Sequence, residues 1–357
     1  MRSTPLGRTG IAVSQVTLGA APLGNLFHAV SDEDAAATVE AAWDRGIRSF
    51  DTAPHYGLGL SERRLGAALR DRPRNRYTIS TKVGRLLRPR PGAHGTDLDN
   101  GFAVPATHRR VWDFTARGVR AGIEESLTRL GLDHVDIVYL HDPDDHERDA
   151  FDLAYPELER MRAEGTVGAI GAGMNQTVML TRFVRETDVD VVLLAGRYSL
   201  LDQSGLATLL PEAARRGVSV LVGGVFNSGL LADPGPGATF DYAPAPARLL
   251  ERALALKTVC EAFDVPLRAA ALQFPFSHPA VAGILLGARS PDEVADAAAM
   301  FTRPVPPALW AALRSAGLLP GDVPLPADPH HRGAPPTPAS APHTRASDPN
   351  TPPRRRP

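Results

Sequence analysis

The chain has 357 residues, of which 43% are hydrophobic and 22% charged, and its formal net charge is −1. This length accommodates one large α/β domain, and the balanced charge gives no indication of nucleic acid or an acidic membrane surface as a partner. The single cysteine, Cys260, excludes an internal disulfide and is typical of a reducing compartment, and no apolar run is long enough to span a membrane. We therefore expect a cytoplasmic protein.

The predicted elements alternate along the chain after a short hairpin with a glycine-containing turn at residues 5–13. Apolar, β-branched runs predict strands at 16–19, 49–52, 77–82, 135–141, 167–171, 191–195, 219–222 and 281–286. Helical periodicity predicts helices at 32–45, 61–69, 116–130, 150–164, 207–216, 248–263 and 291–301, with Ser31 as the N-cap of the first. This order favours a closed parallel (β/α)8 TIM barrel, with an open doubly wound sheet as the alternative.

Three stretches interrupt the alternation. Residues 84–110 are rich in Arg, Pro and Gly, and residues 224–247 are rich in Gly and Pro. Both follow predicted strands, so we expect them at the face of the barrel where long loops shape substrate and cofactor sites. From residue 319 onward Pro, Ala, His and Arg dominate and apolar periodicity stops. We therefore expect a barrel domain at 1–318 and a disordered tail at 319–357.

Four polar side chains lie at or just past the carboxyl ends of successive predicted strands. Asp51 and Tyr56 follow the second strand, Lys82 ends the third and His141 ends the fourth. Each alone has a structural explanation, such as a turn cap, a buried hydroxyl, a solvated amine or a core imidazole. Lys82 and Lys257 are the only lysines in a chain that otherwise uses arginine. Together the four groups suit proton transfer at a carbonyl or alcohol oxygen.

Several motifs resemble those of the aldo-keto reductase family over roughly residues 1–315. Segment 46–53 reads Gly-Ile-Arg-Ser-Phe-Asp-Thr-Ala, and segment 125–133 reads Glu-Ser-Leu-Thr-Arg-Leu-Gly-Leu-Asp before the predicted strand that ends in His141. Segments 112–114, 141–144, 194–201 and 223–229 resemble most strongly the bacterial sugar and pyridoxal dehydrogenases, the group of L-fucose (D-threo-aldose) dehydrogenase and pyridoxal 4-dehydrogenase.

The resemblance implies a barrel that holds NAD or NADP without a Rossmann domain, and a catalytic tetrad of Asp51, Tyr56, Lys82 and His141. Tyr56 would exchange a proton with the substrate oxygen while the nicotinamide carries the hydride. A phenol has an unperturbed pKa of about 10, and the nearby Lys82 ammonium is expected to lower it. Asp51 would hold Lys82, and His141 would orient the substrate oxygen.

At the cofactor-binding positions that the resemblance implies, this sequence departs from the common family pattern. Many family members hold the nicotinamide amide with a Ser-Asn pair after the fifth strand, a Gln after the sixth and a Tyr after the seventh. Here these places align with segment 171–175, Ala195 and Gly223, so Asn175 and Phe226 are the candidates to replace them. The other expected contacts are Ser228 and Leu230 in the 224–247 loop, and Gly287, Arg289 and Glu293 in a segment similar to the family's adenosine loop. Glu293 stands where NADP users often have Arg, which favours NAD, with NADP as the alternative.

The function expected from this resemblance is NAD-linked oxidation of an aldose at C1, as in L-fucose (D-threo-aldose) 1-dehydrogenase. The alternatives are pyridoxal 4-dehydrogenase and a general NADPH-dependent aldehyde or ketone reductase. Two readings from other classes are a Lys82-dependent aldolase and a non-catalytic cofactor-binding subunit. The acidic cluster after His141 lacks the spacing of a metal site, so no metal is expected. The partner expected is a small sugar, aldehyde or alcohol, and the sequence leaves the oligomeric state open.

Overall fold

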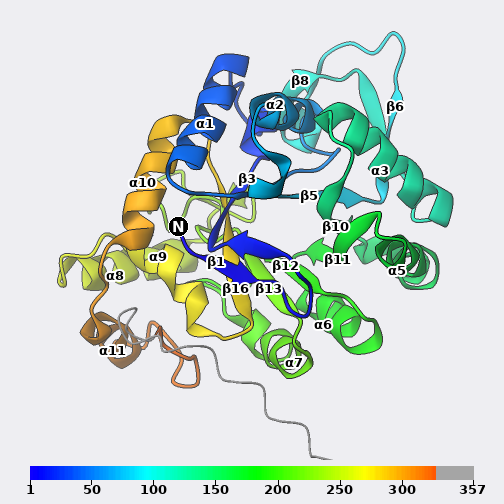
Figure 1. The fold of residues 1–357 in the computed structure, drawn as a ribbon. Helices are drawn as coiled ribbons and strands as arrows, with labels where there is room; N and C mark the ends of the chain where they lie inside the picture. The colour runs from blue at the N-terminus through cyan, green and yellow to red at the C-terminus, as the bar shows by residue number, and fades with distance from the viewer. Residues whose placement is uncertain (327–357) are drawn as a thin grey trace, which may run out of the picture.

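The computed structural model describes residues 1–326, which form a closed barrel of eight parallel strands surrounded by helices (Figure 1). In order around the barrel, the strands are β3 (Val16–Gly19), β4 (Ser49–Asp51), β5 (Thr78–Val83), β10 (Val135–His141), β11 (Val167–Met174), β12 (Val191–Ala195), β13 (Ser219–Gly223) and β16 (Val281–Gly287). β16 pairs with β3, with Ile284 opposite Val16, and this closes the barrel. Each predicted strand matches one of these to within three residues at either end, so the predicted TIM barrel is confirmed.

A hairpin closes the amino-terminal end of the barrel. Strands β1 (Ser3–Pro5) and β2 (Ala12–Ser14) pair antiparallel and lie across the front of the barrel in Figure 1. Leu6 and Val13 of this hairpin are buried against interior barrel side chains, among them Ile137 and Leu221. The backbone N–H of Gly7 donates to Ser219 Oγ at 2.7 Å. With this end filled, only the carboxyl ends of the strands can open to a ligand.

The helices that pack around the barrel are α1 (Asp32–Asp44), α2 (Leu60–Leu69), α3 (Ala116–Leu130), α4 (Glu147–Asp149), α5 (Tyr155–Ala163), α6 (Thr177–Glu186), α7 (Leu209–Arg216), α8 (Ala247–Glu261), α9 (Leu267–Gln273), α10 (Pro291–Thr302) and α11 (Pro307–Ser315). Ser31 caps α1 as predicted, since its Oγ accepts from Asp34 N at 2.9 Å. The first part of the predicted helix at 150–164 is a π-helix, Ala150–Ala154. Helices α6, α9 and α11 and the short α4 are additional to the prediction.

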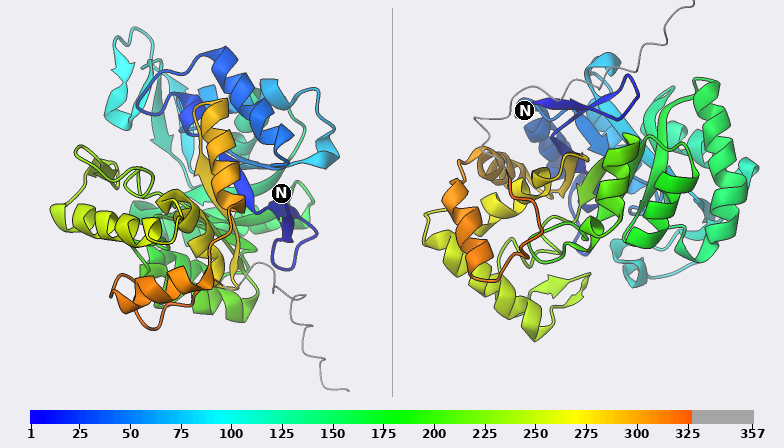
Figure 2. Two further views of the ribbon diagram at one scale, coloured as in Figure 1. Left: turned by 90° about the vertical axis from the view of Figure 1, so that its left-hand side faces the viewer. Right: turned by 90° about the horizontal axis from the view of Figure 1, so that it is seen from below.

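The two long connections carry strands of their own. In the first, β6 (Arg85–Pro89) pairs with β9 (His108–Trp112), and β7 (Thr96–Asp97) pairs with β8 (Phe102–Pro105). In the second, β14 (Thr239–Phe240) pairs with β15 (Ala243–Pro244). The left view of Figure 2 shows both connections, in cyan and yellow-green, extending on the side away from the N-terminal hairpin. They therefore frame the open end of the barrel.

The packed chain continues past the expected domain boundary at residue 318. Leu319 and Val323 are 1% and 2% exposed, because they lie against the apolar core after α11. The tail predicted from residue 319 thus begins with a packed segment, and its part from 327 to 357 lies outside the described residues. Within residues 1–326, no helix combines the length and apolar character needed to cross a bilayer.

Candidate active site

The four residues predicted as a tetrad meet at the carboxyl ends of neighbouring strands. Asp51 is the last residue of β4, Lys82 lies near the end of β5, and His141 is the last residue of β10. Tyr56 stands in the loop between β4 and α2. The rings of Tyr56 and His141 face each other edge-on with centroids 5.8 Å apart. The barrel therefore brings together side chains that are 90 residues apart in sequence.

Lys82 is the centre of the group. Its ammonium donates to Asp51 Oδ2 at 2.5 Å, to the Thr52 carbonyl at 3.0 Å and to the Tyr56 hydroxyl at 3.1 Å. The side chains of Lys82 and Asp51 are 2% and 0% exposed, and the other oxygen of Asp51 accepts from Ser80 Oγ at 2.7 Å. A buried ammonium with three acceptors has its hydrogen-bonding capacity filled. Lys82 is consequently fixed with its charge against the phenol.

The protonation states follow from burial and charge. Burial raises the pKa of Tyr56 to about 12, although Lys82 acts in the opposite direction. The lowered phenol pKa expected from the sequence is therefore not found, because desolvation outweighs the ammonium. Burial opposes the charge of Lys82, but Asp51 and Tyr56 outweigh it and leave the lysine pKa above its ordinary value. Burial, then Arg85 and Lys82, hold the pKa of His141 well below 6.5, so its imidazole is neutral.

The loop that carries Tyr56 is tightly held. A Cβ at Gly57, whose φ is +61°, would lie 2.2 Å from the Gly24 carbonyl oxygen, so only glycine allows this close approach. Ser61 Oγ donates to the Ala20 carbonyl at 2.7 Å and bonds to Thr52 Oγ1 at 2.8 Å. Gly57 and Ser61 thus set the position of the phenol.

A cavity of about 520 Å³ opens above the tetrad. Tyr56, Lys82 and His141 form its floor, and Asn175 of the predicted cofactor residues also lines it. Its remaining walls mix apolar and polar side chains from the long connections and strand ends, including Phe27, His55, Asn100, Phe102, Asp142, Met174 and Tyr242. A cavity with convergent polar groups at the open end of a barrel is the expected place for a substrate.

A second cavity, of about 650 Å³, adjoins the first and shares Leu26, Phe27 and Tyr242 with it. It is lined by five of the predicted cofactor residues, namely Phe226, Ser228, Gly287, Arg289 and Glu293. Leu230 lines neither cavity, because its side chain is fully buried in the core.

The adenosine-loop residues in the second cavity are paired with each other. Arg289 Nε and a terminal nitrogen donate to Glu293 Oε1 at 3.0 and 2.6 Å, and the Arg289 backbone N–H donates to Glu293 Oε2 at 2.8 Å. Glu293 lies in the first turn of α10, and Ser290 is the N-cap of that helix.

The two adjoining cavities fit the dinucleotide that the resemblance implies. They run from the tetrad to the amino-terminal end of α10, where backbone N–H groups and Arg289 suit the polar adenosine half. The cavity beside the tetrad would take the nicotinamide and the substrate, and it presents two amide-bearing side chains, those of Asn175 and Asn100. The bound nicotinamide would supply hydride transfer, which no side chain can perform.

Several residues of the site had not been assigned a role from the sequence. Arg85 donates to Asp142 Oδ2 at 2.5 Å, and this carboxylate lies 3.6 Å from His141 Nε2. His55 lines the same cavity and accepts from Arg110 Nε at 2.5 Å. Asp142 follows His141 inside one of the segments that carry the resemblance, and His55 directly precedes Tyr56, so their proximity in sequence to the tetrad was available as a signal. The sequence held no such signal for Arg85 and Arg110, because the pairing of β6 with β9 brings them to the site.

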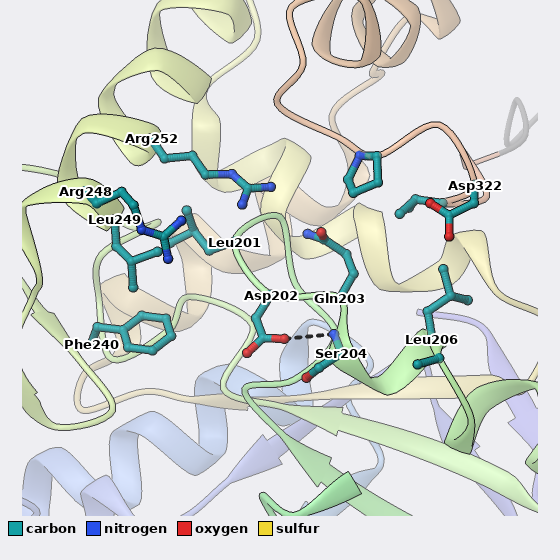
Figure 3. A pocket seen from close by; sticks show the side chains of 13 residues that line it. Leu201, Asp202, Gln203, Ser204, Leu206, Phe240, Arg248, Leu249, Arg252 and Asp322 are labelled. Carbon is teal, nitrogen blue, oxygen red and sulfur yellow. Dashed lines mark hydrogen bonds between the residues drawn. The ribbon is translucent and has the colours of Figure 1, made fainter.

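A third pocket, of about 560 Å³, lies away from the tetrad between the 201–207 segment, α8 and the segment after α11 (Figure 3). Arg248 and Arg252 extend into it from one wall and face Asp202 and Gln203. Arg252 also donates to the Leu318 carbonyl at 2.9 Å. None of the predicted site residues lines this pocket. In the part of the chain that is described, no group of three or more His, Cys, Asp or Glu side chains is placed to hold a metal ion.

Comparisons with known proteins identify the family of the chain. The model of the Aldo/keto reductase family matches residues 15–317. The chain is 48% identical over 316 residues to D-threo-aldose 1-dehydrogenase of Pseudomonas sp., covering 87% of this chain and 96% of that protein. It is 42% identical over 332 residues to pyridoxal 4-dehydrogenase of Microbacterium luteolum, covering 88% and 97%.

A solved structure supports the same fold. The glycerol dehydrogenase AKR11B4 from Gluconobacter oxydans superposes with a TM-score of 0.72 at 24% identity, covering 92% of this chain and 98% of that one. Given the barrel, the tetrad geometry and the match over residues 15–317, the chain belongs to the aldo/keto reductase family and is an NAD(P)-dependent oxidoreductase.

Proposed function

We propose that this enzyme is an NAD-linked aldose 1-dehydrogenase of the D-threo-aldose type, which oxidises the anomeric carbon of a small sugar to its lactone. The observation that carries the proposal is a tetrad beneath a cavity walled by hydrogen-bonding side chains, including His55, Asn100 and Asp142. A sugar with several hydroxyls suits such a wall better than a simple aldehyde does. The 48% identity to D-threo-aldose 1-dehydrogenase supports the same substrate class.

The oxidation removes a hydride and a proton from the sugar; the cofactor would accept the hydride and the protein accepts the proton. NAD, held along the two adjoining cavities, would supply the acceptor for the hydride that leaves C1 of the sugar. Tyr56 takes the proton from the anomeric hydroxyl in its phenolate form, which is a minor species at neutral pH because burial raises its pKa to about 12, and the C1–O bond becomes the lactone carbonyl. Lys82, 3.1 Å away, stabilises the phenolate, and Asp51 keeps Lys82 in place. Neutral His141 donates a hydrogen bond to the same oxygen and holds it in line.

The preference for NAD is supported by Glu293. A carboxylate at this place can accept from ribose hydroxyls and would repel a 2′-phosphate. Its pairing with Arg289 reduces this repulsion, so we expect discrimination against NADP to be moderate.

Oxidation of pyridoxal is the second candidate. The 42% identity to pyridoxal 4-dehydrogenase and the aromatic rings of Phe27, Phe102 and Tyr242 around the cavity favour it. These rings could stack on a pyridine, whereas the carboxylate and amide side chains favour a sugar.

The contacts of Lys82 argue against the two readings from other classes. Imine formation by an aldolase needs a neutral amine, and Asp51 keeps the pKa of Lys82 above its ordinary value. A non-catalytic subunit would have no need of a phenol held at 3.1 Å from this ammonium. We also propose a cytoplasmic location, which the single buried cysteine, Cys260, supports.

The test is a comparison of kcat/KM for three substrate sets. These are the aldoses L-fucose, D-arabinose and L-galactose with NAD, pyridoxal with NAD, and aromatic aldehydes with NADPH. The highest value is expected for an aldose with NAD. Turnover of the aromatic aldehydes alone would leave only the family assignment standing, and a clear advantage of pyridoxal would establish the second candidate.

A further inference from the structure

His55 occupies a place in the site that the tetrad chemistry does not use. It precedes Tyr56 and lines the substrate cavity. Its ring centroid lies 6.0 Å from that of Tyr56 and 5.7 Å from that of His141. The three rings therefore border the same part of the substrate cavity.

The contact with Arg110 locates the proton of His55. Arg110 Nε lies 2.5 Å from His55 Nδ1. A guanidinium can only donate, so Nδ1 must be the unprotonated nitrogen that accepts. The proton of the neutral imidazole is then on Nε2. Among residues 1–326, no hydrogen bond from this Nε2–H to a protein acceptor is found, so it remains available to a ligand in the cavity.

Arg110 is itself firmly positioned. It donates to both carboxylate oxygens of Asp97, at 2.9 and 2.6 Å, and to the His55 carbonyl at 3.0 Å. The side chains of Arg110 and Asp97 are 11% and 5% exposed. A bidentate, largely buried pair of this kind has little freedom to reorient. The paired hairpins between β5 and α3 thus reach into the site through Arg110.

Burial and the positive charges around His55 keep its imidazole neutral. Burial, then Arg85, Arg110 and Lys82, lower its pKa to about 2. The nearby carboxylate of Asp97 does not reverse these effects, since it is engaged with Arg110. At the pH where the enzyme would work, His55 is a hydrogen-bond donor with a fixed tautomer and no charge.

We propose that His55 is a substrate-binding residue that donates from Nε2 to the C2 hydroxyl of the aldose, and that Arg110 is a positioning residue that fixes its tautomer. This inference rests on the proposed aldose oxidation. Tyr56 and His141 hold the oxygen on C1, and His55, beside both, is placed for the oxygen on the neighbouring carbon. The sugar would be recognised through two adjacent oxygens by the rings of Tyr56, His141 and His55.

The first experiment compares an aldose with its 2-deoxy analogue, both with NAD. His55→Phe should lower kcat/KM for the aldose roughly tenfold, the factor of one neutral hydrogen bond, and leave the 2-deoxy sugar within about twofold. His55→Gln, whose amide can donate from a similar position, should recover much of the loss. His108→Phe, the same change on β9 outside the cavity, is the matched control and should have no effect on either substrate.

The second experiment observes the tautomer directly. Long-range ¹H–¹⁵N spectra of the wild-type imidazoles should show His55 protonated at Nε2, and Arg110→Leu should give a mixture of tautomers. A proton on Nδ1 in the wild type would overturn the inference, as would equal losses for both sugars in His55→Phe. If the wild type turns over pyridoxal or aldehydes but no aldose, the proposed function fails and this inference fails with it.

Discussion

The buried ion pair of the tetrad allows a sharp test by Lys82→Met. The substitution leaves the Asp51 carboxylate, 0% exposed, with Ser80 as its remaining side-chain donor. Breaking a buried pair by removing one partner costs about 3–5 kcal/mol, because an uncompensated charge stays in the interior. Typical domains have unfolding free energies of about 5–15 kcal/mol, so the variant should lose about a fifth of its stability or more. It should also lose turnover, since the phenolate has no neighbouring cation.

The matched double variant, Asp51→Asn with Lys82→Met, separates stability from chemistry. The amide keeps the shape of Asp51 and can still accept from Ser80, so most of the lost stability should return. Turnover should remain low, because the double variant also lacks the ammonium. Urea unfolding followed by circular dichroism measures the stability of each variant, and NAD reduction measures turnover. A single variant as stable as the double variant would refute the reasoning that the carboxylate depends on Lys82.

The other predictions concern proton transfer, cofactor choice and acid stability. Tyr56→Phe should lower kcat by about 10²–10⁴-fold while fluorescence titration shows unchanged binding of NADH; near-normal turnover would exclude Tyr56 as the proton carrier. Glu293→Arg should move the NAD/NADP ratio of kcat/KM toward NADP, by about 1 kcal/mol or roughly fivefold, since Arg289 already offsets the carboxylate; an unchanged ratio would exclude Glu293 as the determinant. The unfolded state binds protons at His55 and His141 below pH 6.5 and the folded state does not, so stability is complete above 6.5 and falls with acidification, by about 2–3 kcal/mol at pH 4.5 for His55. His55→Phe should flatten this slope in urea titrations at several pH values, and a slope identical to wild type would contradict the assignment.

The strands and the tetrad could be predicted because their signals are local. A buried parallel strand is a short apolar run, and its carboxyl end is read directly from the chain. Asp51, Lys82 and His141 stand at such ends, so the barrel geometry brings them together without further information.

The additional helices lack one or another of these signals. Thr177 and Val178 give α6 a β-branched start, and Gln176 makes no side-chain cap bond. Helix α9 is almost entirely buried, so it shows no polar face and no periodicity. Helix α11 stands between prolines, close to the Pro-rich tail.

The hairpins between β5 and α3 could not be predicted from the sequence. Arg85 of β6 pairs with Trp112 of β9 across a long insertion rich in Pro and Gly, and such composition is typical of an irregular loop. The predicted direction of the Tyr56 pKa shift was wrong for a different reason. A neighbouring lysine is visible in the sequence, whereas the loss of water around the phenol depends on the folded cavity.

The three acceptors of Lys82 also have a consequence for chemical labelling. An amine reacts with an acylating reagent only as the neutral free base. Lys82 is buried, protonated and fully hydrogen-bonded, so it should not react. The only other lysine, Lys257 on α8, has a side chain 40% exposed. An amine-reactive fluorophore ester should therefore modify Lys257 and leave Lys82 unmodified. No engineered residue is needed, and the reaction centre is not altered. The native enzyme thus offers a single-lysine attachment point on its outer helices.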